Sequence, residues 1–401
     1  MRARRKSLAI VLAAAIVVSG TAVSAWALRG DSSTATVSKD LESRPDTELR
    51  GVLDQVVAGG VPGVIARIQQ GREVHALAAG VDDLTTGARL RPAAKLRVGS
   101  ITKTFVATVV LQLVGEGRLG LDEPVETWLP GLLPDGDAIT VRHLLQHSSG
   151  LADYVETPGF IEGLLENPVY EPEELVALAT DRPLEFRPGT DFAYSSTGYV
   201  VAGLLVEAVT GNSLGRELRH RIFKPLDLAS TSFPASERTL GGRHARGYVP
   251  GEQAPTPQAE PLDVTEINPS WAWAAGALVS SAADVSRFYQ SLLSGRLLKP
   301  RLLKEMKSTV DDPEGGGEYG LGIARIQTPC GVFWGHEGAL PGYVTWALTT
   351  DDARRSVVLA VTMNPVPQPA RAPYLEAQRL VVCGPSGNPR AAESIEPRRA
   401  E

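Results

Sequence analysis

Apolar residues near the two ends of the chain are grouped as β-strands require, in short runs separated by turn residues. In the first part, two apolar stretches flank the turn Gln70-Gly71, and this arrangement predicts a β-hairpin between Gly63 and Gly80. Three segments in the last part are β-rich and predict strands, namely 331–335, 343–350 and 356–362. A helix is predicted after them, from Pro369 to Cys383.

The apolar positions between these two parts follow the helical period instead. Residues Ser100 to Glu116 predict a helix that begins at a hydroxyl side chain and ends before Gly117. Two more helices are expected at 198–210 and 281–294. Strands at both ends with helices between them predict an α+β fold, in which one sheet is built from both ends of the chain and a helical insertion separates them.

The first 27 residues have the pattern of a targeting segment. Four basic side chains among the first six residues precede an apolar run from Leu8 to Val18, and Ala25-Trp26-Ala27 fits a signal peptidase site. The stretch from Ser7 to Leu28 nearly spans a bilayer, so an uncleaved anchor is the alternative to a signal peptide. Either alternative places the rest of the chain outside the cytoplasm, secreted or at the cell envelope, with membrane contact only through such an anchor.

Polar segments lie on either side of the predicted domain. Residues 28–45 are rich in Ser, Thr and charge and are interpreted as a linker, and residues 385–401 are expected to form a disordered tail. Residues 46–384 remain as the folded domain. The formal net charge is -6 over 401 residues and the domain holds no block of basic residues, so we expect no nucleic-acid partner.

The two cysteines, Cys330 and Cys383, favour a disulfide in an oxidising compartment, and two buried thiols are the alternative. Neither has a histidine cluster with ligand spacing nearby, so no metal site is predicted. His143 and His147 have the spacing of zinc ligands on a helix. However, Leu144 follows His143 where a metalloprotease has Glu, and we interpret both histidines as structural.

The first candidate for chemistry is the sequence Ser100-Ile101-Thr102-Lys103. Residues three apart on a helix share a face, so Lys103 is expected one turn from Ser100. A Ser at a helix N-terminus lies among free N–H groups that favour developing negative charge. A neutral Lys amine can take the hydroxyl proton if burial lowers its pKa. The alternative is an N-cap Ser with a solvated Lys, because S-x-x-K is common by chance.

Two more candidates follow along the chain. Tyr194-Ser195-Ser196 places a Tyr before two hydroxyls on a loop, where it can donate, accept and relay a proton, and a surface tyrosine is the alternative. Trp334-Gly335-His336-Glu337-Gly338 places a His beside glycines that let a ligand approach the backbone, and a packed structural His is the alternative. Each pattern is weak alone, so the interpretation depends on their order and spacing.

Together the three patterns resemble the penicillin-recognising serine hydrolases, namely class C β-lactamases, exocellular D-alanyl-D-alanine carboxypeptidases and related esterases. Those families carry S-x-x-K, then Y-x-N, then K/H-x-G. The resemblance covers about residues 47–384 and implies a β-lactamase-like fold with an antiparallel sheet flanked by helices. The exocellular carboxypeptidases pair cysteines at the positions of Cys330 and Cys383, so this disulfide is implied. Three further stretches resemble these families, and they are 139–151, 274–284 and 319–322.

The resemblance also implies a role for each motif residue. Ser100 would attack an amide or ester carbonyl and become acylated, while Lys103 and Tyr194 share the proton transfers. His336 stands where other members place Lys. The backbone N–H groups of Ser100 and Ala339 would bind the oxyanion, and water would then hydrolyse the acyl-enzyme without a cofactor.

Three departures from the family pattern concern substrate recognition. Ser196 replaces the Asn of Y-x-N and lacks an amide's paired donor and acceptor. Glu337 replaces the hydroxyl residue between His and Gly, and its carboxylate would repel a terminal substrate carboxylate unless protonated or turned away. Ala324, with Arg325 beside it, aligns with a carboxypeptidase Arg. The candidate substrate-binding residues are Ser196, Glu337, Gly338, Trp271 and Arg325, with an ordinary core or rim position as the alternative for Trp271.

The leading hypothesis is a D-alanyl-D-alanine carboxypeptidase-like serine hydrolase that acts on cell-wall peptides. The first alternative is a β-lactamase or an esterase on the same scaffold. The second is a catalytically silent peptidoglycan- or penicillin-binding protein, against which the full set of motif residues argues. The expected partner is a small molecule or peptide: a D-amino-acid peptide, a β-lactam or an ester.

Overall fold

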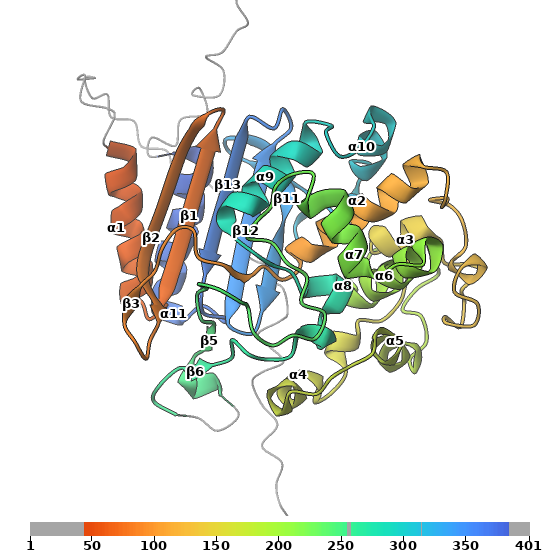
Figure 1. Cartoon of the computed structure of the whole chain (residues 1–401), viewed down its shortest axis with the longest axis horizontal. Coiled ribbons are helices and arrows are strands. Elements are labelled where there is room, and N and C mark those ends of the chain that lie inside the picture. Colours follow the sequence, from red (N-terminus) through yellow and green to blue (C-terminus); the bar gives the residue numbers. More distant parts are fainter. Residues whose placement is uncertain (1–43, 255–257, 314, 385–401) are drawn as a thin grey trace, which may run out of the picture.

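A computed structural model describes residues 44–254, 258–313 and 315–384 (Figure 1). The predicted targeting segment, the linker as far as residue 43 and the C-terminal tail lie outside these residues. Over the described part of the chain, no helix has the length and apolar character needed to cross a membrane.

A nine-stranded sheet lies at the centre of the fold, in the order β3-β2-β1-β13-β12-β11-β10-β9-β8, and its neighbouring strands are antiparallel. The two ends of the chain meet where β1 pairs with β13, from Val64 opposite Val361 to Gln70 opposite Arg355. The prediction of one sheet built from both ends is therefore confirmed. The strands are β1 (Gly63–Gln70), β2 (Glu73–Asp83), β3 (Ala88–Arg89), β8 (Val310–Asp312), β9 (Gly317–Tyr319), β10 (Ala324–Thr328), β11 (Gly331–Leu340), β12 (Tyr343–Thr350) and β13 (Arg355–Val361).

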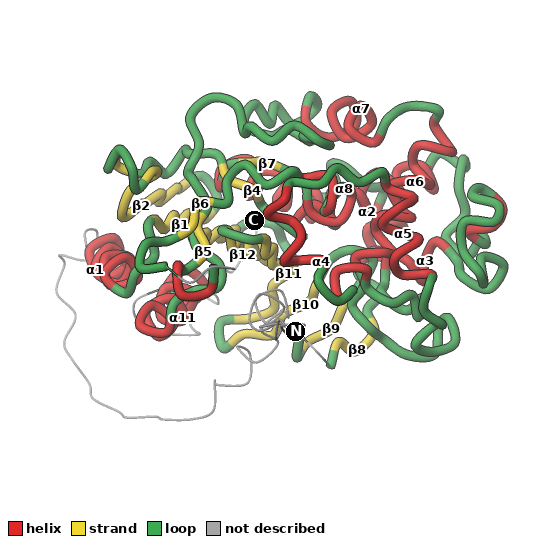
Figure 2. The backbone as a smooth tube through the Cα atoms, turned by 90° about the horizontal axis from the view of Figure 1, so that it is seen from below, coloured by secondary structure: helices red, strands yellow, loops and turns green. Residues whose placement is uncertain are grey.

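Helices cover both faces of the sheet (Figures 1 and 2). On the outer face, α1 (Arg44–Ala58) and α11 (Gln368–Cys383) pack against each other. On the inner face, α9 (Ala282–Leu293) packs on β12 and β13, and the helical insertion lies beside it. The helices of the insertion are α2 (Ile101–Gly115), α3 (Val141–Leu145), α4 (Phe160–Gly163), α5 (Pro172–Thr180), α6 (Ser196–Thr210), α7 (Leu214–Leu218) and α8 (Trp273–Gly276), and α10 (Pro300–Met306) lies near α2.

Two hydrophobic cores follow from this layering. The inner core joins the sheet to the insertion, and α2 passes through it with apolar or small side chains on every side, as a helix enclosed by protein requires. The outer core joins the sheet to α1 and α11. Along β11 the two cores alternate, because Trp334 belongs to the inner core and Phe333 to the outer one.

Most predicted elements are present, with differences at their ends. The helix expected at 100–116 is α2, flanked by Ser100 and Glu116, and Gly117 follows with φ +73°. The strand expected at 331–335 continues to Leu340 as β11. In this continuation Gly335 and Gly338 are extended residues where other backbone comes close, as glycines beside a strand-edge His predict.

Candidate active site

Ser100 and Lys103 lie at the start of α2, one turn apart, as the spacing predicts. Ser100 immediately precedes the helix, and its side chain is partly exposed. The Lys103 Nζ atom donates to Ser100 Oγ at 3.1 Å and to the Ala275 carbonyl oxygen at 3.1 Å. The amine therefore lies against the hydroxyl while only 1% of the residue is exposed.

The burial of Lys103 changes its chemistry. Desolvation lowers the pKa of Lys103 to about 7, and the nearby carboxylate of Asp153 acts in the opposite direction. A large fraction of the amine is then neutral near pH 7, with a lone pair that can accept the Ser100 proton. The ring of Tyr194 lies 4.8 Å from Nζ and covers one side of the amine.

Tyr194 completes a hydroxyl–amine–hydroxyl cluster. Its side chain is hydrogen-bonded to Ser100, and burial raises the pKa of Tyr194 well above its ordinary range, so the phenol keeps its proton. The ring of His147 lies 4.2 Å from the Tyr194 ring, and His147 Nδ1 accepts the Ser195 N–H at 3.0 Å. His147 thereby fixes the loop that carries Tyr194.

His336 lies on β11 and contacts the same group of rings. Its Nε2 is 2.8 Å from the Tyr319 hydroxyl, and its Nδ1 contacts the Glu337 carbonyl oxygen, which can only accept. The ring therefore carries its proton on Nδ1 and accepts from Tyr319. Desolvation, aided by Lys103, lowers the pKa of His336 to about 3, so the ring is neutral.

Two glycines bring the start of α2 against β11. A Cβ on Gly99 would lie 2.8 Å from the Ala339 nitrogen, and a Cβ on Gly338 would lie 3.0 Å from the Ser100 nitrogen. Gly99 also has φ +56°, which a side chain would strain. The backbone nitrogens of Ser100 and Ala339 are thus brought close together. Because β10 pairs with β11 only as far as Gly335, the rest of that edge has no β10 partner.

Ser196 follows Tyr194 and opens α6. Its N–H donates to Asp153 Oδ2 at 3.0 Å, and its hydroxyl is also hydrogen-bonded to that carboxylate. Burial raises the pKa of Asp153, whereas the N–H groups of Val155 and Ser196 and the charge of Lys103 lower it. The partly exposed residue Asp153 therefore contacts Ser196, which stands at the Asn position of the Y-x-N pattern.

Two of the predicted substrate-binding residues, Trp271 and Arg325, have other contacts in the structure. Trp271 is 5% exposed; its carbonyl accepts from the Tyr154 hydroxyl at 2.6 Å and its ring packs edge-on against Phe160, as an ordinary core aromatic does. Arg325 on β10 forms an ion pair with Glu318 of β9. Glu318 already neutralises its charge, so a substrate carboxylate would have to compete with Glu318 for Arg325.

Glu337 lies between His336 and Gly338 on β11, where side chains alternate between the two faces. His336 and Trp334 face the insertion, so Glu337 faces the outer layer, where its charge acts on Tyr374 of α11. Desolvation raises the pKa of Glu337 to about 7.

The other residues considered from the sequence have structural environments. His143 caps α3, where its Nδ1 accepts the Thr140 N–H at 3.3 Å, while His147 points into the ring cluster described above. The Cys330–Cys383 disulfide is present, with 5.5 Å between the Cα atoms, and it links the β10–β11 turn to α11. In the residues that the structure describes, no group of His, Cys, Asp and Glu could hold a metal ion.

Two residues of this site, Asp153 and Tyr319, belong to none of the sequence motifs, whereas His147 has the structural role that its sequence context predicts. Tyr319 lies inside the stretch 319–322 that carries the resemblance, so that stretch was the available signal. Asp153 has a weaker signal, since it comes shortly after the stretch 139–151.

The arrangement has the parts that acyl transfer requires. A hydroxyl nucleophile contacts an amine with a lowered pKa, a protonated phenol contacts the same hydroxyl, and two backbone nitrogens lie close together beside it. The sequence model of the Beta-lactamase family matches residues 49–381. The chain belongs to the Beta-lactamase family. It is therefore a serine hydrolase with the β-lactamase fold, as the sequence resemblance implied.

Solved relatives in this family include enzymes named for amide hydrolysis. The D-stereospecific amidohydrolase from Streptomyces sp. is 36% identical, with a TM-score of 0.77 over 85% of this chain and 99% of that one. The D-amino acid amidase from Ochrobactrum anthropi SV3 is 30% identical, with a TM-score of 0.75 over 84% of this chain and 99% of that one.

Curated relatives match over a shorter part. Penicillin-binding protein 4 of Amycolatopsis lactamdurans is 34% identical over 57% of this chain and 58% of its own length. Esterase EstB of Burkholderia gladioli is 32% identical over 51% of this chain and 54% of its own length. The matches thus span less than two thirds of these relatives, and the named activities differ within the family.

Proposed function

We propose that this serine hydrolase cleaves the amide or ester bond on the carbonyl side of a D-amino acid whose amino group is free. The carboxylate of Asp153 beside Ser196 is the observation that carries this proposal, because it gives the site an anionic group whose charge acts on Lys103. The names of the two solved relatives, a D-stereospecific amidohydrolase and a D-amino acid amidase, support the same substrate class.

The proposed reaction begins with proton transfer. Neutral Lys103 accepts the proton of Ser100 as Oγ attacks the substrate carbonyl carbon, and the Ser100 and Ala339 N–H groups bind the resulting oxyanion. Tyr194 relays the proton from Lys103 to the leaving amine, which departs and leaves a D-aminoacyl ester on Ser100. Water then attacks that ester, the same groups return the proton to Ser100, and the free D-amino acid leaves.

His336 takes a positioning role in this scheme. Both ring nitrogens already have partners, and the neutral ring has little capacity to gain a proton near pH 7 because its pKa is about 3. Its contact with Tyr319 ties β9 to β11 beside the nucleophile. The ring thus keeps the catalytic edge of β11 in place without exchanging a proton with the substrate.

Asp153 suits an ammonium group for electrostatic reasons. Two backbone N–H groups orient its carboxylate, one from Val155 and one from Ser196, each at 3.0 Å. Each oxygen accepts one of these N–H groups and has capacity for a second, so a substrate ammonium would add a charge-assisted hydrogen bond. A terminal carboxylate, in contrast, would need a cation, and Ala324 has no charge while Arg325 is paired with Glu318. The carboxypeptidase hypothesis therefore takes second place.

The decisive experiment compares matched substrates. We expect kcat/KM to be higher for D-phenylalanine amide than for its L-enantiomer, its N-acetyl derivative or a D-Ala-D-Ala peptide. Asp153→Asn should lower kcat/KM for the free-amine amide by about 10–100-fold relative to the N-acetyl amide, because one charged hydrogen bond is lost. The ratio of the two substrates is the readout, since any change in Lys103 affects both alike.

Asp181→Asn is the matched control, because Asp181 is an exposed carboxylate at the end of α5. It should leave both the absolute rates and the substrate ratio unchanged. A wild-type preference for the D-Ala-D-Ala peptide over the free-amine amide would refute this proposal and restore the carboxypeptidase hypothesis.

A further inference from the structure

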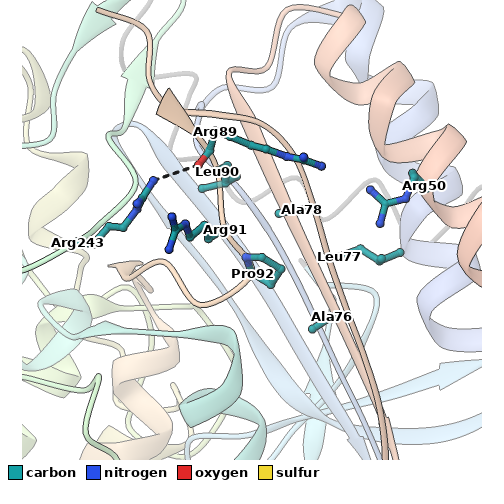
Figure 3. A pocket seen from close by; sticks show the side chains of 9 residues that line it. All are labelled: Arg50, Ala76, Leu77, Ala78, Arg89, Leu90, Arg91, Pro92 and Arg243. Atoms are coloured by element: carbon teal, nitrogen blue, oxygen red, sulfur yellow. Dashed lines mark hydrogen bonds between the residues drawn. The ribbon is translucent and has the colours of Figure 1, made fainter. Parts of the chain in front are cut away.

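A cavity of about 350 Å³ lies at the far edge of the sheet, between α1, β2 and the chain after β3 (Figure 3). Its lining consists of four arginines and five apolar residues. It shares no residue with the catalytic cluster. In the strand order β2 and β11 are four strand spacings apart, which corresponds to about 19 Å.

The arginines come from separate parts of the chain and gather around the edge of β2. Arg50 comes from α1, Arg89 from β3, Arg91 from the segment after it and Arg243 from the insertion. Figure 3 shows the side chains of Arg50 and Arg89 pointing toward one another, while Arg91 lies beside Arg243. All four residues are exposed, so water screens their mutual repulsion, and an anion placed among them would be attracted to each of them.

Within residues 44–254, 258–313 and 315–384, only one of these four arginines has a carboxylate counterion. Arg243 donates to Asp82 Oδ2 at 2.9 and 3.0 Å and also to the Arg89 carbonyl oxygen at 3.2 Å. For Arg50, Arg89 and Arg91, no carboxylate partner lies within ion-pair distance in the part of the chain that the structure describes. The cavity lining includes no acidic residue. Among the described residues, three solvent-exposed guanidinium groups thus have no carboxylate partner, in a chain whose formal net charge is -6.

The floor of the cavity has the opposite character. It includes Leu77 and Leu90, which are 7% and 2% exposed, together with two alanines and a proline. The fold itself covers Leu77 and Leu90, but Ala76 is exposed and Pro92 is partly exposed, and a small inorganic ion would leave these two residues in contact with water. A ligand with both an anionic group and an apolar portion covers both parts of the cavity.

We propose that this cavity is a binding site for a phosphate ester with an apolar portion. A phosphate group presents several oxygens that can accept from more than one guanidinium fork, whereas one carboxylate matches a single fork. The shared chemistry is a phosphate attached to an apolar chain, and it is available either in a membrane lipid or in a soluble ester. The site does not depend on the proposed substrate of Ser100.

Calorimetric titration of the full chain tests the proposal with three probes. These are dihexanoyl phosphatidic acid below its critical micelle concentration, dihexanoyl phosphatidylcholine and inorganic phosphate. We expect phosphatidic acid to bind about tenfold or more tightly than either of the others, because only it combines an apolar chain with an uncompensated phosphate charge. Binding of phosphatidylcholine or inorganic phosphate with equal affinity, or no binding of phosphatidic acid, overturns the proposal.

Variants then locate the site. Arg89→Gln and Arg91→Gln should each weaken phosphatidic acid binding about tenfold, the effect of losing one charged hydrogen bond. Arg219→Gln, at an exposed position outside the cavity, should not change it. Unchanged hydrolysis of a simple ester by all three variants would show that they are folded. Equal affinity in wild type and in both cavity variants overturns the proposal.

Flotation with vesicles separates the two sources of the ligand. Phosphatidylglycerol vesicles that carry wild type upward, but carry Arg89→Gln less, assign the site to a membrane lipid. Phosphatidylcholine vesicles are the control, and any N-terminal anchor affects wild type and variant equally. Tight binding of phosphatidic acid without preferential flotation of wild type assigns the site to a soluble phosphate ester.

Discussion

The two faces of β11 differ in what they contact: one meets the catalytic cluster, and the other meets the outer helix layer. On the inner face, Trp334, His336 and Gly338 meet the insertion and the start of α2, where the catalytic cluster lies. On the outer face, Phe333 and Glu337 lie toward α11, which the disulfide ties to the turn that begins β11. Because side chains alternate along this ten-residue strand, one face of β11 contributes to the catalytic cluster and the other packs against α11.

This division implies that inner-face changes should lower activity more than stability, and outer-face changes should do the reverse. The inner face depends on close approach and on a shifted pKa, which hydrolysis rates report directly. The outer face depends on packing and a covalent link, which unfolding experiments report. Four substitutions test the division, in order of decreasing expected effect.

Lys103→Met removes the proposed base while keeping a side chain of similar volume. We expect kcat/KM to fall by about 10²–10⁴-fold, the usual contribution of a general base, with little loss of thermal stability. In wild type, kcat/KM for the N-acetyl amide, which carries no titrating amino group, should rise with pH up to about 7 and then level off, because Lys103 must be neutral and its pKa is about 7. Lys304→Met, at an exposed residue of α10, is the control. A variant with near-normal turnover would disprove the role of Lys103.

Gly338→Ala tests the close approach on the same face. The new Cβ would lie 1.9 Å from the Val98 carbonyl oxygen and 3.0 Å from the Ser100 nitrogen, so β11 and α2 must separate. We expect kcat/KM to fall about 10²–10³-fold, comparable to the loss of one oxyanion donor. Gly163→Ala is the control, because its Cβ would meet nothing within 4 Å. Acylation by a fluorophosphonate at the wild-type rate would contradict the prediction.

Removal of the disulfide tests the outer face. Replacing Cys330 and Cys383 by Ser should lower the free energy of unfolding by about 2–5 kcal/mol, because the unfolded chain regains conformational freedom. Activity per folded molecule should stay within about twofold of wild type at temperatures below the transition. Chemical denaturation and kinetics on one preparation measure both quantities. Catalysis that fails before unfolding would show that the two faces are coupled.

Glu337→Gln gives the smallest expected effect, and it depends on pH. Burial raises the pKa of Glu337 from its ordinary 4.5 to about 7, so the folded protein holds a proton that the unfolded chain has released between these values. Wild-type stability should therefore fall as pH rises from about 4.5 to 7, by about 1–3 kcal/mol, and stay level above. The Gln variant should lose this slope. Glu252→Gln, at an exposed residue, should retain it.

The sequence predicted the elements and the catalytic cluster better than it predicted substrate recognition. Ser100 and Lys103 share a helix, so their contact follows from a local spacing, and the Tyr194 contact agrees with the motif order. The orientation of Glu337 follows from strand alternation, but the sequence predicts the strand only as far as residue 335, two residues before Glu337. Asp153 and Ser196 are 43 residues apart in the sequence and meet only in the folded protein. A motif that covers a few consecutive residues therefore does not predict their contact.

Arg325 illustrates the same limit for charges. Its partner Glu318 lies on the neighbouring strand β9, directly opposite Arg325. The sequence does not predict the register between these two strands. Whether a charge near a site is available depends on such a partner, and motif alignment does not reveal it.

The pairing of β1 with β13 has a consequence for how the protein is made. Val64 must find Val361, so the central pair of the sheet cannot form until almost the whole domain has been synthesised. Until then the hairpin of β1 and β2 has an unpaired edge, and such long-range pairing makes folding slow and exposes strand edges to aggregation. The catalytic edge of β11 belongs to the same late part of the chain, two strands away from β1's partner. A nascent or truncated chain that lacks β13 therefore has no assembled active site, and hydrolytic activity should appear only once both ends have met.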